Sequence, residues 1–258
     1  MKRQLQQFYK YRFLLNELVK KGIRLKYRRS YLGIMWSLLE PLLEMVVLSI
    51  VFGTLFGNND KTFPVYILSA RLLYSLFSTA TKGALRSVRS NASMIKKVYV
   101  PKYLYPMSSV LFNFVIFLIS LIDLVGVMFV LGVYPTKYLL LSFIPLGILL
   151  MLTYGAGMIL ATMGVFFRDM EYLWNVALML IMYTCAIFYK PERLLDSGFW
   201  WILKFNPLYG VISQFRNCVY GQPLDMWTIC YSAIFSAVAL LVGLYVFKKK
   251  QDEFILHI

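Results

Sequence analysis

The chain has 258 residues, of which 60% are hydrophobic and only 15% are charged. Soluble globular domains carry about a quarter charged residues, so this composition excludes a soluble domain and indicates a protein that crosses a membrane several times. The net charge of +15 would suggest nucleic acid in a soluble protein. Here the basic residues gather at the ends of apolar runs, as the positive-inside rule requires, and we expect no nucleic-acid partner.

The first 31 residues predict an amphipathic helix at the membrane surface followed by a basic segment. One helical face would carry the residues Phe8, Phe13, Leu14, Leu15 and Leu18. From Lys20 to Arg29 the chain is basic and from Leu32 it is apolar, and Tyr27, Tyr31 and Trp36 straddle this change. Charged heads, rings and hydrocarbon follow in this order on crossing a bilayer from the cytoplasm, so the N-terminus is predicted to lie inside.

Six apolar runs predict an all-α polytopic membrane protein. The expected spans are 32–57, 63–81, 107–131, 138–167, 172–189 and 226–247. With this topology the cytoplasmic segments hold 20 of the 27 Lys and Arg residues and the external segments hold 6. This asymmetry places both termini in the cytoplasm.

Four charged residues fall within the predicted spans. Glu40 and Glu44 are four residues apart and share one helical face, while Arg71 and Asp123 stand alone in spans two and three. A charge inside a membrane usually faces a cavity or an opposite charge. The sequence leaves Glu40, Glu44 and Asp123 open as partners of Arg71.

Two connections carry unusual sequences. Residues 82–106 hold six cations and no acid, which places them in the cytoplasm; Asn91 is expected to cap a short helix that ends before Pro101. Such a helix suits docking of another protein; the alternative is simple retention of positive charge inside. Residues 190–225 are too polar to span and too apolar for a solvated loop. We expect two half-helices, divided at Asn206-Pro207, that dip back into the outer leaflet.

Glycine, cysteine and aromatic residues complete the pattern. Gly155, Gly157 and Gly164 predict close helix packing in span four. The three cysteines and the single histidine match no metal or redox motif, and neither a phosphate-binding loop nor a catalytic motif is present. The chain holds 20 Phe, 19 Tyr and 5 Trp. Rings within the spans either form a surface along which a sugar chain slides, or pack against helices and lipid.

Two runs of sequence carry a resemblance to a known family. They are YRRSYLGIMW at Tyr27–Trp36, followed by Glu40-Pro41-Leu42, and NASMIKKVYVP at Asn91–Pro101. Both resemble motifs of ABC-2 type polysaccharide export permeases. Further pairs follow in the family's order, namely Arg168-Asp169, Asn206-Pro207-Leu208 and Phe215-Arg216.

The resemblance implies a single transmembrane domain over 1–258 that exports lipid-linked polysaccharide, such as O-antigen or a cell-wall glycan, across a bacterial cytoplasmic membrane. It implies a homodimer with two copies of a separate ATP-binding subunit, which would bring ATP and Mg²⁺. No cofactor or metal is expected in the chain itself. The closest alternatives are a teichoic acid exporter and an ABC-2 drug or small-lipid exporter; a membrane-embedded glycan transferase, which would need no ATPase, is a third.

The resemblance also implies roles for four groups of residues. The pyrophosphate-lipid headgroup would arrive at Arg24, Arg28 and Arg29. The translocation pathway would include Trp36, Arg71, Tyr74, Phe77, Tyr154, Tyr183 and Phe188. The external gate would include Phe199, Trp200, Trp201, Asn206 and Pro207. Coupling to the ATPase would involve Asn91, Met94, Ile95, Lys96, Lys97 and Val98.

Overall fold

The computed structural model describes residues 2–28, 30–56, 60–98, 100–192 and 198–257, and all regular structure within them is helical. The longer helices are α1 (Lys2–Tyr27), α2 (Trp36–Phe56), α3 (Phe63–Ser90), α5 (Leu104–Val130), α6 (Phe143–Phe166), α7 (Met170–Thr184), α10 (Pro207–Val219) and α11 (Met226–Lys250). Short helices are α4 (Ala92–Lys97), α9 (Trp200–Lys204) and α12 (Phe254–His257), with 3₁₀ turns η1 (Gly33–Met35) and η2 (Lys137–Ser142).

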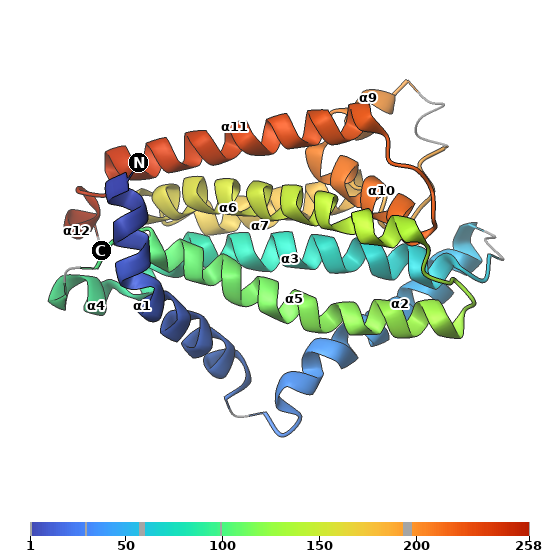
Figure 1. The fold of residues 1–258 in the computed structure, drawn as a ribbon, viewed down its shortest axis with the longest axis horizontal. Coiled ribbons are helices and arrows are strands. Elements are labelled where there is room, and N and C mark those ends of the chain that lie inside the picture. Colours follow the sequence, from blue (N-terminus) through green and yellow to red (C-terminus); the bar gives the residue numbers. More distant parts are fainter. Residues whose placement is uncertain (1, 29, 57–59, 99, 193–197, 258) are drawn as a thin grey trace.

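The long helices α3, α5, α6, α7 and α11 lie alongside one another and form an elongated bundle (Figure 1). Both chain termini, α4 and α12 gather at one end, which we call the basic end because it also carries Lys248–Lys250. The opposite end holds α9 and α10, and we call it the α10 end. This grouping agrees with the predicted topology, in which the termini and residues 82–106 lie on the same side.

Four helical segments are long and apolar enough to cross a membrane. They are Gly33–Leu55, Leu104–Val130, Lys137–Phe166 and Met226–Lys250. Among the described residues, α3 and α7 do not meet the same limits; α7 has only 15 residues. The chain is therefore an all-helical membrane protein, in which four of the six predicted spans qualify on length and composition alone.

Helix α3 extends beyond the second predicted span. Span two was expected to end at residue 81 and a loop to follow, but α3 continues unbroken to Ser90. Ala84, Leu85 and Val88 are buried in the bundle while Lys82 and Arg86 face outward. The cations that suggested a loop occupy the exposed side of an amphipathic helix, whose buried side holds it in place.

Helix α7 ends before the fifth predicted span does. The span was expected to reach residue 189, but α7 ends at Thr184 and Ala186 has a positive φ of 47°. A non-glycine residue in this conformation ends a helix. The following residues, including Phe188, are nevertheless buried within the bundle as irregular chain.

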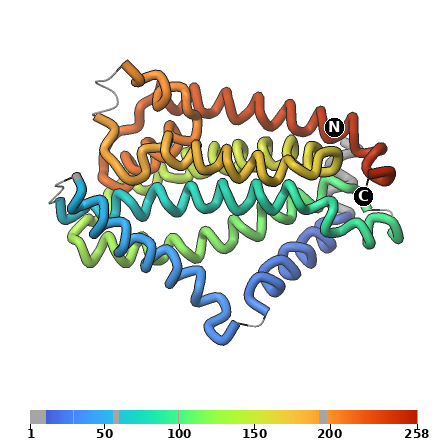
Figure 2. Tube along the Cα trace, turned by 180° about the vertical axis from the view of Figure 1, so that it is seen from behind, coloured from blue at the N-terminus to red at the C-terminus, as the bar shows by residue number. Residues whose placement is uncertain are grey.

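Helix α1 crosses the basic end and then diverges from the bundle. Leu15 and Leu18 are buried, whereas Phe13 is 74% exposed, so the predicted apolar face is only partly correct; the side chain of Phe8 lies outside the described ones. Figures 1 and 2 show α1 and α2 diverging from a turn that stands away from the bundle. Gly22 allows α1 to approach α5, since a Cβ there would lie 2.7 Å from the Phe112 ring.

One hydrophobic cluster joins separate elements at the basic end. It includes Leu18 of α1, Val88 of α3, Ile95 of α4, Phe247 of α11 and Phe254 of α12. Lys102 adds a polar contact by donating from Nζ to the carbonyl of Gln251 at 2.5 Å. The N-terminal helix, α4 and the C-terminal segment therefore form one packed platform.

The predicted close packing at the glycines of α6 is confirmed. A Cβ on Gly155 would lie 2.5 Å from the backbone nitrogen of Leu240 in α11, and one on Gly243 would lie 2.5 Å from the carbonyl oxygen of Gly155. Gly164 likewise approaches the backbone of Leu85 in α3. Small residues let these backbones touch, which is the usual means of helix association in membranes.

Candidate functional site

A groove of about 540 Å³ lies between α2, α3 and α7. We call it the α2–α7 groove; its lining residues are Leu43, Glu44, Val47, Leu48, Phe52, Arg71, Met182, Tyr183 and Phe188. Helix α2 supplies five of them, at positions that share one helical face. The groove therefore runs along α2, and α3 closes the side that faces the bundle.

An ion pair forms the polar part of the groove. Arg71 donates from Nε to Oε2 of Glu44 at 2.6 Å and from its terminal nitrogen to Oε1 at 2.8 Å. Such a two-point contact fixes both side chains. The Arg71 side chain is 23% exposed and that of Glu44 is 36% exposed, so the pair faces the groove. Of the three carboxylates that the sequence left open, Glu44 is the partner of Arg71.

Aromatic rings form the end of the groove nearer α10. The rings of Phe52 and Phe188 stack with centroids 4.9 Å apart, and Tyr183 lies at 6.4 Å from Phe188. The Tyr183 side chain is half exposed. The groove thus combines a charged pair that can hydrogen bond with apolar faces that can stack.

Three of the seven predicted pathway residues line the groove, namely Arg71, Tyr183 and Phe188. Tyr74 is buried beneath Arg71, whose guanidinium lies 5.7 Å from its ring centroid, and its hydroxyl donates to the Leu178 carbonyl at 2.7 Å.

The other three lie elsewhere. Phe77 is buried against Trp174, with ring centroids 6.2 Å apart. Tyr154 packs against the hydrophobic clusters from α6. Trp36 is exposed at the start of α2.

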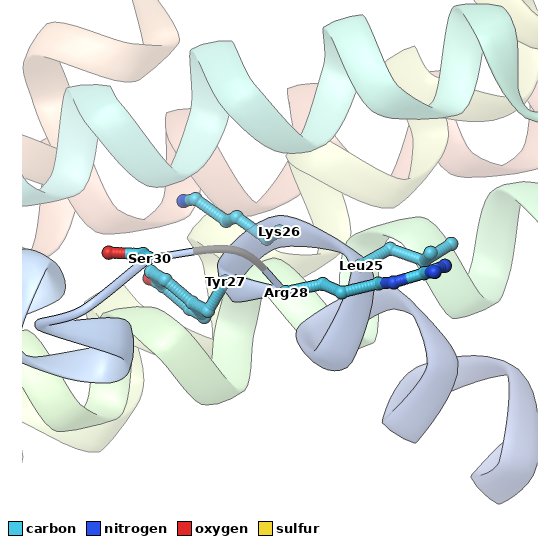
Figure 3. A pocket seen from close by; sticks show the side chains of 5 residues that line it. All are labelled: Leu25, Lys26, Tyr27, Arg28 and Ser30. Carbon is cyan, nitrogen blue, oxygen red and sulfur yellow. The ribbon is translucent and has the colours of Figure 1, made fainter.

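A basic surface lies at the turn between α1 and α2. A pocket of about 310 Å³ there is lined by Leu25, Lys26, Tyr27, Arg28 and Ser30 (Figure 3). Figure 3 shows Lys26 and Arg28 extending in opposite directions, so the cations spread over a surface and do not converge. Burial lowers the pKa of the Lys26 ammonium, and the Glu40 carboxylate opposes this shift.

Two further cations, Arg24 and Arg29, were assigned to this surface together with Arg28. Arg24 and Arg28 are both exposed, and no ion pair is recorded for either among the described residues. Arg29 lies outside the described residues. The surface therefore offers uncompensated positive charge at the turn where the chain enters α2.

Helix α4 forms between residues 92 and 97, as predicted, but Asn91 does not cap it with its side chain. Its amide nitrogen donates to the Ser87 carbonyl at 2.8 Å and so closes the end of α3; only its backbone carbonyl begins α4, accepting from Met94 and Ile95 at 3.0 Å. Asn91 is the single residue between the end of α3 and the start of α4. Its side chain bonds to the end of α3, where the Ser87 carbonyl lies within reach.

The side chains of α4 divide into an inner and an outer set. Ile95 is buried and Met94 packs against the same cluster. Lys96, Lys97 and Val98 are exposed. The surface offered to a partner is therefore mainly basic, with Val98 beside the lysines, while Met94 and Ile95 chiefly hold α4 on the bundle.

At the α10 end, Asn206 and Pro207 start α10 as the sequence suggested. The Asn206 side-chain oxygen accepts from the backbone nitrogens of Leu208 and Tyr209 at 3.0 and 3.3 Å, and Pro207 occupies the first turn. Beside them, the three predicted gate aromatics Phe199, Trp200 and Trp201 are all exposed. They form an apolar surface on α9.

Arg216 is a residue that sequence reasoning noted only as part of a motif. It is buried in α10 and donates to the carbonyls of Tyr66, Ala186 and Ile187 at 3.0 to 3.3 Å. Its guanidinium also lies over the Tyr66 ring, 3.3 Å from the centroid. Among the described residues it has no carboxylate partner. Arg216 thus joins α10 to the start of α3 and to the irregular chain after α7.

The sequence held a usable signal for the burial of Arg216. Its neighbours Ile212, Phe215 and Val219 recur at helical spacing and are buried. Position 216 falls beside this apolar stripe. An arginine at such a position needs internal acceptors, and the unpaired carbonyls after α7 supply them.

Comparison with known proteins places this arrangement in a family. The sequence model described as ABC-2 type transporter matches residues 14–220, from within α1 to the end of α10. The chain is 28% identical over 258 residues to the O-antigen export system permease protein RfbA of Myxococcus xanthus, covering 98% of both chains. It is 27% identical over 243 residues to the protein of the same name from Klebsiella pneumoniae, covering 93% of both.

A third relative is the polysialic acid transport protein KpsM of Escherichia coli, 24% identical over 240 residues, with 91% of this chain and 92% of the relative covered. The family match includes the α2–α7 groove, α4 and Arg216. The chain belongs to the ABC-2 type transporter family.

Proposed function

We propose that the chain is the permease subunit of an ATP-driven exporter that moves lipid-linked polysaccharide across the cytoplasmic membrane of a bacterium. The observation that carries this proposal is similarity along almost the whole chain to two O-antigen export permeases. Both termini would lie in the cytoplasm with the basic end, where the positive-inside rule places Lys248–Lys250.

The α2–α7 groove supports a sugar polymer as cargo. Within the lining, the Glu44 carboxylate and the Phe52 ring lie about two turns of α2 apart, so a carboxylate is followed by a ring toward the α10 end. Carboxylates accept hydrogen bonds from hydroxyl groups, and ring faces pack on the apolar faces of sugars. Because Glu44 neutralises Arg71, the groove offers little attraction to a polyol phosphate, which favours a glycan over teichoic acid.

A second copy of the chain would complete the path. Helix α7 buries only Leu178, and of the described residues of α2 only Ser37 and Met45 are buried. The exposed faces of both helices are apolar and flank the groove. A twofold homodimer through α2 and α7 would cover them and enclose two grooves face to face. If α3 and α7 are counted as spans, each copy has six transmembrane helices and the dimer has twelve. In the dimer, protein would surround α3 and α7, and this would shield their polar or irregular parts from lipid.

The energy would come from a separate subunit. The chain has no phosphate-binding loop, so two copies of an ATP-binding subunit would bring ATP and Mg²⁺. The exposed basic side of α4, with Lys96, Lys97 and Val98, is the proposed contact. Arg24 and Arg28, with Arg29, are the proposed arrival site of the substrate's pyrophosphate, which arginine binds well.

The α10 end would form the external gate. Helices α9 and α10 would dip back from the outer surface, with Phe199, Trp200 and Trp201 at the level of the outer leaflet, where aromatic rings are favoured. The network around Arg216 would hold α10 across the outer end of the path.

The function is tested by removing the chain from its host. We expect a surface polysaccharide to accumulate inside the cell, still linked to lipid pyrophosphate, and a plasmid copy to return it to the surface. Accumulation of a polyol-phosphate polymer instead would identify the exported cargo as teichoic acid and not as a glycan. Normal surface polymer, or full activity of the purified chain in vesicles without any ATPase, would contradict the proposal.

The groove is tested separately with Arg71 and Glu44. Arg71→Ala leaves a carboxylate unpaired and should reduce export while the double variant Arg71→Gln, Glu44→Gln recovers part of it, because breaking one half of an ion pair costs more than removing both. Export is measured as surface polymer in the deletion host. Equal loss in the single and double variants would exclude the pair as a unit.

A further inference from the structure

A second groove lies on the other side of α2, between α2, α5 and the start of α3. It encloses about 340 Å³ and is lined by Leu42, Met45, Pro64, Ile122, Asp123, Gly126, Val127, Val130 and Leu131. Asp123 is the only charged residue in this lining. Its side chain is 7% exposed, and its Oδ2 oxygen accepts no hydrogen bond from any described residue. We call this the Asp123 groove.

A buried carboxylate oxygen without a donor is costly, and the described residues supply none to Oδ2 of Asp123. Arg71 is held by Glu44 on the other face of α2. Ser120, one turn before Asp123, donates its hydroxyl to the carbonyls of Ser37 and Ile116. The free energy lost by leaving an ionisable acceptor unpaired in an apolar site is large, so a donor from outside the chain would bind favourably.

The position of the groove limits what that donor can be. Asp123 lies seven residues before Val130, where α5 ends, which is about 10 Å along the helix. The 27 residues of α5 extend about 40 Å, more than the roughly 30 Å of bilayer hydrocarbon. The carboxylate therefore lies near the depth at which lipid headgroups meet their acyl chains, in the leaflet at the α10 end.

The surroundings of the groove select an amphiphile. Ile122 beside its mouth and Leu118, one turn nearer the bilayer centre, are exposed and apolar, as a surface against acyl chains would be. Helix α2 separates the groove from the α2–α7 groove, so a polymer passing there would not reach Asp123. A ligand with a cationic hydrogen-bond donor at one end and hydrocarbon at the other fits both features.

We propose that the Asp123 groove binds an aminophospholipid, with the primary ammonium of its headgroup donating to the Asp123 carboxylate and its acyl chains lying against Ile122 and Leu118. The site rests on the proposed orientation of the chain in the membrane and not on the identity of the exported polymer. A bound lipid would fill the space between α2 and α5 and so support α2 on the side away from the α2–α7 groove.

The test is lipid retention by the purified full-length chain. The protein is extracted into detergent, exposed to an equimolar mixture of phosphatidylethanolamine, phosphatidylglycerol and phosphatidylcholine with matched chains, and examined by native mass spectrometry. A charge-assisted hydrogen bond should favour phosphatidylethanolamine over both others on the order of tenfold. Phosphatidylcholine controls for charge without a donor, and phosphatidylglycerol for hydroxyl groups without a cation.

Three variants locate the contact. Asp123→Asn keeps the shape and should abolish the preference, while Asp252→Asn removes the same charge at the basic end and should keep it. Gly126→Leu fills the groove and leaves Asp123 intact; a Cβ at Gly126 meets no atom within 4 Å, so the helix should tolerate it. It too should abolish the preference. No preference in the wild type, or retention of it in Asp123→Asn or in Gly126→Leu, overturns the proposal.

Lipid retention is measured without any export assay. A chain that exports another substrate would still show the lipid preference, and a chain without the preference could still export polysaccharide. The two proposals therefore fail independently.

Discussion

The guanidinium of Arg216 meets three backbone carbonyls and a tyrosine ring within the α10 end. These carbonyls belong to chain that has left helical geometry, at Ala186 and Ile187, or to the first turns of α3, at Tyr66. Arginine suits this place because its planar guanidinium donates from three nitrogens in fixed directions, whereas a lysine ammonium donates from a single nitrogen. Arg216 therefore supplies the hydrogen-bond donors that these backbone carbonyls do not find within a helix.

Replacement of Arg216 by lysine should destabilise the protein although the charge is kept. Each buried carbonyl left without a donor costs about 1–3 kcal/mol, and the single nitrogen of lysine cannot occupy the three nitrogen positions from which the guanidinium now donates. We expect a lower midpoint of thermal unfolding in detergent and loss of export. Arg168→Lys, at an exposed position of the turn after α6, is the control and should unfold like the wild type. An unchanged midpoint for Arg216→Lys would show that the carbonyls find other donors.

The charged residues show what sequence can and cannot predict at this scale. The sequence indicated that Arg71 needs a partner, because a lone intramembrane cation is costly. It could not choose between Glu40, Glu44 and Asp123, since the choice depends on the rotation of α2 about its axis and on the offset between α2 and α3. Asp123 was a reasonable candidate by depth, yet it lies on the far side of α2 from Arg71.

Helix α4 shows the same limit at the scale of an element. Its existence and its end before Pro101 followed from proline and charge, but which side faces inward depended on the platform formed by α1, α11 and α12. Similarly, the length of α3 was hidden because its last turns are polar on one side. Contacts between elements distant in sequence decided both, and a single sequence does not display them.

Charge reversal on α4 should separate docking from folding. Lys96→Glu with Lys97→Glu changes only exposed side chains, so we expect normal thermal stability but weaker co-purification of the ATP-binding subunit. Ile95→Asp buries a carboxylate and should instead lower stability by a few kcal/mol, on the order of other buried charge insertions. The measurements are thermal unfolding and pull-down. Full co-purification with the double reversal would move the docking surface elsewhere.

The contact between α6 and α11 gives a prediction with an internal control. Gly155→Ala should push the helices apart, because its Cβ would lie within 2.5 Å of the α11 backbone. Gly147→Ala lies in the same helix with no atom within 4 Å of the new Cβ, and should be neutral or stabilising by about 0.5–1 kcal/mol. Thermal unfolding of both variants decides; equal midpoints would contradict close packing at Gly155.

The whole molecule has a basic end and an α10 end, and its orientation can be tested directly. In a chain with Cys230→Ser, which removes the exposed native thiol, a cysteine at Lys137 should react with a membrane-impermeant maleimide in intact cells. A cysteine at Lys97 should react only after permeabilisation. The opposite pattern would invert the topology and with it the proposed direction of transport.

The proposed homodimer gives a second test at this scale. A cysteine at Val176, on the exposed face of α7, should cross-link to its copy in membranes and give a species of twice the chain mass of 30.1 kDa. A cysteine at Ile234 is equally exposed on α11 but away from α7, and should not. Cross-linking through Ile234 alone would place the dimer contact on the other side of the bundle.

One consequence of α3 reaches across the whole molecule. It runs about 42 Å without a break, from the carbonyls of Thr62 and Tyr66, which Tyr220 and Arg216 hold, to Asn91, where α4 begins. A continuous helix of this length has no hinge at which a rotation would be absorbed. A tilt that the ATP-binding subunit imposes at α4 would therefore be transmitted along α3 to the residues that hold α10. Movement of α4 at one membrane face and displacement of α10 at the other would then be one motion.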